Sequence, residues 1–144
     1  MYILDTDHLS FIQRNGQEGK QILSRLAAIE ELEVAVTVIT YEEQVRGRLN
    51  FLSKARTLDE QILAYKGLQQ LALDYQSIVI IPFNRAAALE HQRLRRVYPR
   101  LGNMDLKIAA ITLINNATLL TRNKSDFGQV VELRIEDWSA ADNQ

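Results

Sequence analysis

The stretch Tyr2-Ile3-Leu4-Asp5-Thr6-Asp7 is the most informative in the chain, because a short apolar run gives way at once to polar residues. Such a run predicts a strand that is buried on both faces, as strands in parallel sheets are. We expect this strand over residues 2–4, ending at Asp5. Ligand sites in open α/β sheets form beyond the carboxyl ends of the strands, so Asp5 is a first candidate site residue.

Helical and strand patterns alternate along the rest of the chain. Helices are predicted where apolar residues recur every three to four positions, over residues 19–30, 40–52, 54–75, 85–97 and 105–116. Further strands are predicted over residues 34–39, 78–81, 118–120 and 132–135. This alternation predicts an α/β fold, in which helices on both sides cover a central and mainly parallel sheet of four to five strands.

Length and composition narrow the class of protein. A chain of 144 residues fits one domain spanning residues 1–144, and 47% hydrophobic with 24% charged residues indicates a globular protein. With no cysteine and only two histidines, His8 and His91, thiolate chemistry is excluded and a histidine-built zinc site is disfavoured. No apolar run approaches the roughly 20 residues of a membrane helix, and no export signal is visible, so we expect a cytoplasmic protein without membrane contact.

Four acidic residues follow predicted strands or begin predicted helices: Asp5, Glu43, Asp105 and Asp126. Because the carboxyl ends of parallel strands meet at one edge of the sheet, we expect these carboxylates to converge. Carboxylates are preferred ligands of Mg²⁺ and Mn²⁺, and such cations activate water and stabilise charge on phosphate. Without a cation, two like charges about 4 Å apart repel by ~1 kcal/mol in water and ~4 kcal/mol at an intermediate dielectric. The pattern predicts metal-dependent phosphodiester hydrolysis.

Each acid also has a purely structural interpretation. Glu43 stands three residues after Thr40, which is the spacing of a capping box. Asp105 falls in the first turn of a helix, where a carboxylate favours the helix dipole. Asp5 and Asp126 fit turns in which aspartate bonds the backbone. His8 is interpreted as a packed or solvated residue and not as a ligand.

The net charge of −1 does not by itself indicate nucleic-acid binding, but the arginines are clustered. A balanced total can hide a basic surface beside an acidic site, and the alternative is a set of solvated helix faces. The arginines expected near the site are Arg46, Arg93 and Arg96.

These residues together resemble the PIN-domain family, and within it the VapC-type toxins. Residues 3–7 with Ser10, then residues 38–47, 102–110 and 120–127, resemble four successive blocks of that family, and residues 133–139 resemble its ending. In the second block a threonine and a glycine bracket the acid, which selects Glu43 over Glu42. The blocks span nearly the whole chain in the family's order.

The resemblance implies a PIN-like three-layer α/β/α sandwich and a metal-dependent endoribonuclease, the toxin of a type II toxin–antitoxin system. It further implies homodimerisation, inhibition by a small antitoxin protein, and an RNA substrate, with tRNA among the candidates. The catalytic and metal-binding carboxylates are then Asp5, Glu43, Asp105 and Asp126, with Mg²⁺ or Mn²⁺ as cofactor, and Asn123 is an alternative to Asp126. Supporting or RNA-binding roles fall to Thr6, Asp7, Thr121, Arg122 and Asn123.

Two departures from the family pattern affect surfaces and not the acids. Gln44 stands where an apolar residue is more usual, and the segment from Phe51 to Tyr75 is long. Leu58, Ile62, Tyr65, Leu68, Ala72 and Tyr75 form an apolar stripe that is expected to be core or a contact surface for a second copy or the antitoxin.

Three alternative functions remain open at this point. The first is an RNA-processing nuclease of the same fold that works without an antitoxin. The second is a phosphatase of the haloacid dehalogenase type, suggested by Asp5-Thr6-Asp7, although Leu9 stands where threonine or valine would be expected. The third is a catalytically silent binding module, which the four filled acidic positions argue against.

Overall fold

The computed structural model describes residues 1–30 and 33–140. Its centre is a five-stranded, all-parallel sheet in the order β3-β2-β1-β4-β5. The strands are β1 (Tyr2–Leu4), β2 (Val34–Thr37), β3 (Ile80–Ile81), β4 (Thr118–Leu120) and β5 (Arg134–Glu136). The predicted parallel α/β sheet is therefore confirmed, with β1 at its centre.

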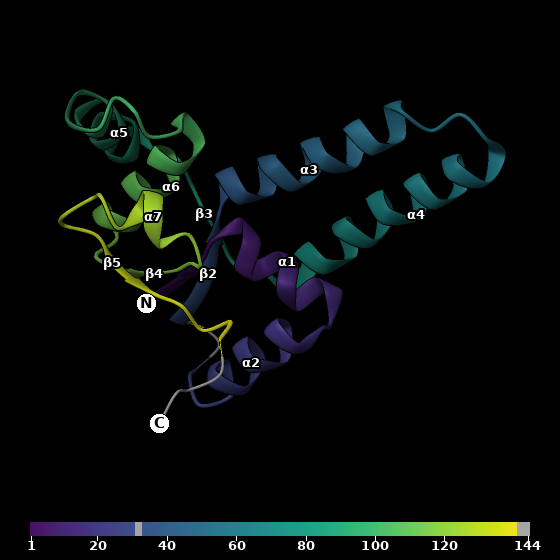
Figure 1. Cartoon of the computed structure of the whole chain (residues 1–144), viewed down its shortest axis with the longest axis horizontal. Helices are drawn as coiled ribbons and strands as arrows, with labels where there is room; N and C mark the ends of the chain where they lie inside the picture. The colour runs from purple at the N-terminus through teal and green to yellow at the C-terminus, as the bar shows by residue number, and fades with distance from the viewer. Residues whose placement is uncertain (31–32, 141–144) are drawn as a thin grey trace.

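Helices cover both faces of the sheet, giving three layers (Figure 1). Neighbouring side chains of a strand point to opposite faces, so Ile3 and Leu4 enter different cores. Ile3 packs in the core that α5 (Arg85–Val97) and α6 (Asn103–Ile114) close. Leu4 packs in the core under α1 (Thr6–Arg14) and α2 (Gln17–Leu26).

The chain between the first two strands differs from the prediction. Helix α1 was not predicted, and it starts because the Asp5 carboxylate caps it by accepting a hydrogen bond of 2.8 Å from the backbone N–H of His8. Helix α2 begins at Gln17 and ends at Leu26. The helix predicted over residues 19–30 therefore starts two residues after the observed one and ends four residues after it.

Helix α3 (Val38–Ser53) starts two residues earlier than predicted, and β2 is shorter in consequence. Its N-cap is Thr37, whose hydroxyl accepts a hydrogen bond of 3.1 Å from the backbone N–H of Thr40. A side-chain cap thus ends an apolar run that by composition continues as a strand.

Helices α3 and α4 (Leu58–Asp74) lie side by side as a hairpin that projects from the sheet (Figure 1). The predicted apolar stripe is only partly buried. Leu58, Ile62 and Tyr65 are 73%, 47% and 58% exposed, whereas Ala64 and Leu71 are buried. The first half of the stripe is therefore not core, which leaves the predicted alternative of a contact surface. The remaining short elements are η2 (Tyr75–Ser77) and α7 (Lys124–Phe127). No helix in the described ranges is long and apolar enough to span a membrane.

Candidate active site

A cavity of about 180 Å³ lies at the carboxyl edge of the sheet, where the predicted acids were expected. Asp5 reaches it from the end of β1, Glu43 from α3, and Asp105 from the first turn of α6. Thr6 and Asp7 of α1 also line it. Residues 100 positions apart in sequence thus meet because parallel strands end at one edge.

His8 stands behind Asp5 and links it to the end of the described chain. The backbone N–H of Trp138 donates a hydrogen bond of 3.1 Å to Nε2 of the fully buried His8, so the hydrogen of neutral His8 lies on Nδ1. Nδ1 of His8 is 3.5 Å from Oδ1 of Asp5. Among the buried side-chain nitrogen and oxygen atoms of residues 1–30 and 33–140, it is the one that has no hydrogen-bond partner. The sequence predicted a packed or solvated His8, and the structure buries it.

Glu43 does not form the capping box that its spacing suggested. Thr37 is the cap, and the Glu43 carboxylate instead accepts a hydrogen bond of 2.8 Å from the Thr6 hydroxyl across the gap to α1. The Thr6 hydroxyl also lies 3.1 Å from that of Thr40. Burial raises the pKa of Glu43, the bond from Thr6 lowers it, and the charge of Asp7 raises it further.

Asp105 has the strongest electrostatic signature of the site. Burial, followed by the charges of Glu43, Asp126 and Asp5, raises the pKa of its carboxyl to about 6. Burial and Asp5 likewise raise the pKa of Asp7, against the opposing charges of Arg14 and His8. These carboxylates therefore destabilise one another's charged forms, and positive charge among them would relieve this repulsion.

At the fourth predicted position, Asn123 and not Asp126 lines the cavity. The Asn123 amide donates a hydrogen bond of 3.0 Å to Asp126, which places the carboxylate behind it. Buried Thr121 holds this segment, because its hydroxyl accepts a hydrogen bond of 3.0 Å from the backbone N–H of Asn123. Arg122 lies over the ring of Phe11, 5.8 Å from its centroid, and does not line the cavity.

The side chains around the cavity offer the type of ligand atom, oxygen, that a hard divalent cation binds. Oxygen ligands surround a polar cavity, and Mg²⁺ needs only a few carboxylates because it retains several waters. In the described part of the chain, however, no three acidic or histidine side chains form a ready-made group for a metal ion. One carboxylate oxygen of Asp5 instead accepts from the His8 backbone N–H, and one of Glu43 accepts from the Thr6 hydroxyl.

The arginines expected near the site lie elsewhere. Arg93 is bonded to Glu90 and Glu132, and Arg46 is paired with Glu42 on its own helix. Neither these two nor Arg96 lines the acidic cavity or the pocket next to it. That neighbouring pocket is lined by Arg14 and Arg48, so the basic groups beside the acids were assigned to the wrong residues.

Residues 2–133 match the family model of the PIN domain. The chain belongs to the PIN domain family. This PIN domain is similar to Ribonuclease VapC1 of Haemophilus influenzae (strain R2866), with 25% identity over 96% of this chain and 98% of that protein. The resemblance drawn from the sequence blocks is thus confirmed.

Solved structures share the fold of this PIN domain. VapBC-1 from nontypeable Haemophilus influenzae superposes with a TM-score of 0.75 at 23% identity, covering 96% of this chain and 98% of that one. A toxin–antitoxin complex from Klebsiella pneumoniae gives a TM-score of 0.70 at 22% identity with the same coverage. The predicted PIN-like sandwich is confirmed by these likenesses.

Proposed function

We propose that this PIN domain is a Mg²⁺- or Mn²⁺-dependent endoribonuclease that acts in the cytoplasm as the toxin of a toxin–antitoxin pair. The observation that carries the proposal is the cavity at which Asp5, Glu43 and Asp105 meet, with the pKa of Asp105 raised to about 6. The similarity to a protein named Ribonuclease VapC1 supports RNA as the substrate class, with tRNA among the candidates.

In this proposal Asp5, Glu43 and Asp105 hold the cation, and Asn123 with Asp126 behind it fills the fourth position. When bound, the cation activates a water molecule and stabilises negative charge on the phosphate. The chain's own contribution is orientation: the His8 backbone N–H holds Asp5, Thr6 holds Glu43, and Thr121 holds Asn123. Asp7 adds negative charge beside Asp5.

The test is cleavage of RNA by the purified protein. We expect cleavage with Mg²⁺ or Mn²⁺ and none with excess chelator, and undiminished cleavage in chelator would overturn the metal mechanism. Induced in cells, wild type should arrest growth and Asp5→Asn should not. If wild type cleaves RNA in vitro but is as harmless as Asp5→Asn at matched expression, the antitoxin-independent processing nuclease is the better description.

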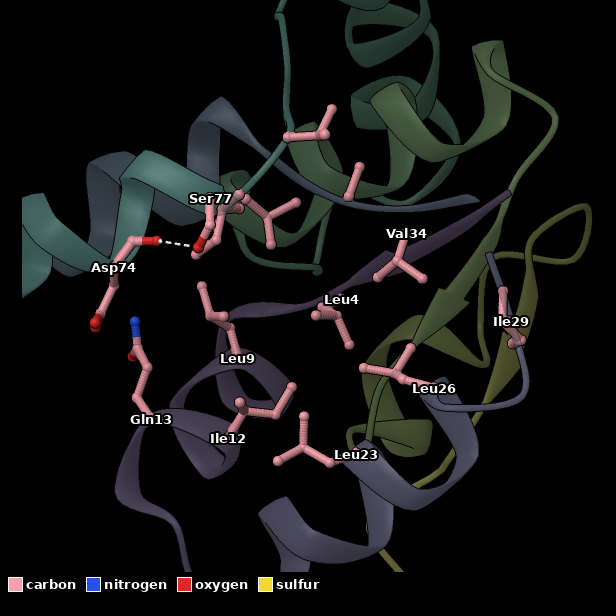
Figure 2. Close-up of a pocket in the computed structure, with 14 residues that line it drawn as sticks. Leu4, Leu9, Ile12, Gln13, Leu23, Leu26, Ile29, Val34, Asp74 and Ser77 are labelled. Atoms are coloured by element: carbon pink, nitrogen blue, oxygen red, sulfur yellow. Dashed lines mark hydrogen bonds between the residues drawn. The ribbon is translucent and has the colours of Figure 1, made fainter. Parts of the chain in front are cut away.

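The antitoxin is proposed to occupy an apolar groove of about 690 Å³ on the α1–α2 side of the sheet. Leu9 and Ile12 of α1, Leu23 and Leu26 of α2, and Val34 at the start of β2 point into it (Figure 2). An amphipathic helix binds in such a groove with its apolar face. The groove replaces the Leu58–Tyr75 stripe as the antitoxin surface expected from the sequence.

The outer half of α4 is proposed to contact a second copy of the chain. Leu58, Leu63 and Tyr65 are 73%, 60% and 58% exposed there, and large exposed apolar groups mark interaction surfaces. A homodimer formed through this hairpin leaves the apolar groove on the α1–α2 side accessible to the antitoxin.

Light scattering with two charge substitutions separates the two surfaces. The chain alone is expected at twice its mass of 16.5 kDa at tens of micromolar. With the small antitoxin protein that we expect to be encoded next to it, the measured mass should be higher. Leu23→Glu should abolish partner binding and keep the dimer, whereas Leu63→Glu should do the reverse. A monomeric wild type, or a partner complex indifferent to Leu23→Glu, contradicts the respective assignment.

A further inference from the structure

A second polar pocket, of about 510 Å³, adjoins the acidic cavity between α1 and α3. Its walls are Ser10, Gln13 and Arg14 from α1 and Gln44, Arg48 and Phe51 from α3. We propose that this pocket is an RNA subsite that holds a nucleotide next to the scissile phosphate. The inference rests on the proposed ribonuclease function and adds to it the residues that bind the RNA chain next to the cleavage site.

The pocket and the acidic cavity share a wall. Thr6 and Glu43 line both, and the 2.8 Å hydrogen bond between them forms that wall. A ligand that fills both spaces must therefore extend from one to the other. A polynucleotide is such a ligand, and it carries a phosphate at every step.

The charges in the pocket suit phosphate. In the described part of the chain, Arg14 and Arg48 form no hydrogen bond or ion pair, in contrast to Arg46 and Arg93, whose guanidinium groups are held by glutamates. An unpaired guanidinium presents two parallel donors to phosphate oxygens. Arg14 and Arg48 thus bring two guanidinium groups that no carboxylate holds in an ion pair to the pocket that adjoins the acids.

Phe51 supplies an aromatic face at the pocket. Its side chain is 49% exposed, although a phenylalanine ring is normally buried. Proteins bind single-stranded nucleic acid by combining a basic groove with aromatic rings on which bases stack. Arg48 and Phe51 lie one helical turn apart on α3, so phosphate and base contacts come from one face.

Gln44, which stands where an apolar residue is more usual, forms the floor of the pocket. Its amide donates a hydrogen bond of 2.8 Å to Gln13 and accepts one of 2.8 Å from the hydroxyl of Tyr75. The polar side chain therefore ties α1, α3 and the end of the α4 hairpin into a fixed floor. A rigid polar pocket suits a nucleotide, whereas the apolar groove on the α2 side suits a protein segment.

Gly47 provides a way to fill the pocket without disturbing the core. A Cβ atom at Gly47 would meet no atom within 4 Å, and the residue lies inside α3 and lines the pocket. A leucine at this position extends into the pocket space. Gly47→Leu is therefore a blocking variant that is expected to fold.

The experiment measures the dissociation constant of a labelled single-stranded RNA oligonucleotide by fluorescence anisotropy, at several salt concentrations, in the Asp5→Asn background. Arg14→Ala and Arg48→Ala should each weaken binding roughly tenfold and reduce the salt slope of the logarithmic affinity by about 1. Phe51→Ala and Gly47→Leu should weaken binding by a similar factor. Arg46→Ala and Leu49→Ala are the matched controls, because Arg46 is paired and Leu49, 48% exposed on the same helix, does not line the pocket.

Unchanged RNA affinity in all four pocket variants, with melting temperatures near wild type, overturns the subsite even if the protein cleaves RNA. Loss of antitoxin binding together with unchanged RNA affinity also overturns it and assigns the pocket to the partner. Failure of the proposed function looks different, since the wild-type chain would then show no RNA cleavage. Gly47→Leu with a raised melting temperature and weakened RNA binding supports the subsite and excludes misfolding as the cause.

Discussion

Asp105→Asn is expected to stabilise the metal-free protein at pH 7.5 while abolishing RNA cleavage. The ordinary pKa of 3.8 is raised to about 6 by burial and by neighbouring carboxylates, so the charged form is disfavoured in the folded state. A pKa shift of that size corresponds to about 3 kcal/mol in the free energy of unfolding. Solvent screens part of this effect, so we expect Asp105→Asn to stabilise the metal-free protein by ~1–3 kcal/mol. Loss of the favourable helix-dipole contact of the carboxylate removes roughly 0.5 kcal/mol of this gain.

The stabilisation expected for Asp105→Asn depends on pH in a defined direction. A carboxyl whose pKa is raised on folding favours the folded state when protonated, so its contribution falls as pH rises from about 4 through about 6 and is constant above. The difference in stability between Asp105→Asn and wild type should therefore be small at pH 4 and full at pH 7.5. Chemical denaturation in chelator at both pH values measures it.

Asp59→Asn is the matched control, because Asp59 also lies in the first turn of a helix but is exposed on α4. It should cost a few tenths of a kcal/mol through the helix dipole, with unchanged RNA cleavage. Cleavage by Asp105→Asn should fall by at least about 100-fold, since binding and orienting a cation contributes several kcal/mol to catalysis. Destabilisation of Asp105→Asn at pH 7.5 would show that the carboxylate braces the fold instead.

Gly19→Ala is expected to destabilise the protein by about 2 to 3 kcal/mol. A Cβ atom at Gly19 would stand 2.2 Å from the carbonyl oxygen and 2.8 Å from the carbonyl carbon of Phe11. Both atoms are backbone, so α1 and α2 must move apart, and overpacking of this kind typically costs 1 to 3 kcal/mol or more. Because α1 carries Thr6 and Asp7, RNA cleavage should fall as well.

Gly47→Ala is the counterpart on α3, where a Cβ atom meets nothing within 4 Å. The same substitution should there raise stability by roughly 0.5 to 1 kcal/mol, because alanine favours a helix over glycine. Thermal and urea unfolding of the two variants compare them directly. Equal changes in the two proteins would contradict a close approach of α1 and α2 at Gly19.

Much of the fold was predictable because hydrophobic periodicity reports burial. The short run at residues 2–4 correctly indicated a strand buried on both faces. Helix α1 was missed because its nine residues include few apolar positions, and the helix depends on a side-chain cap by Asp5. In α4, periodicity indicated an apolar stripe, but the hairpin with α3 decides which side of it is buried.

The candidate site divides in the same way. Topology alone places Asp5, Glu43 and Asp105 at one edge of a parallel sheet, and the cavity there agrees. Side-chain direction is not contained in spacing, so the sequence left two choices open. Glu43 turns to Thr6 because Thr37 already caps α3. Asn123 lines the cavity, and the Asp126 carboxylate accepts a hydrogen bond from its amide.

The central position of β1 has a consequence for how the protein is made. β1 is synthesised first, but one of its two partners, β4, begins only at Thr118, and His8 receives its hydrogen bond from Trp138, 130 residues later. A growing chain therefore leaves one edge of β1 bare until most residues have left the ribosome. Pairing across such a span is slow compared with local helix formation. The cavity at which Asp5, Glu43 and Asp105 meet is therefore expected to assemble only when synthesis is nearly over.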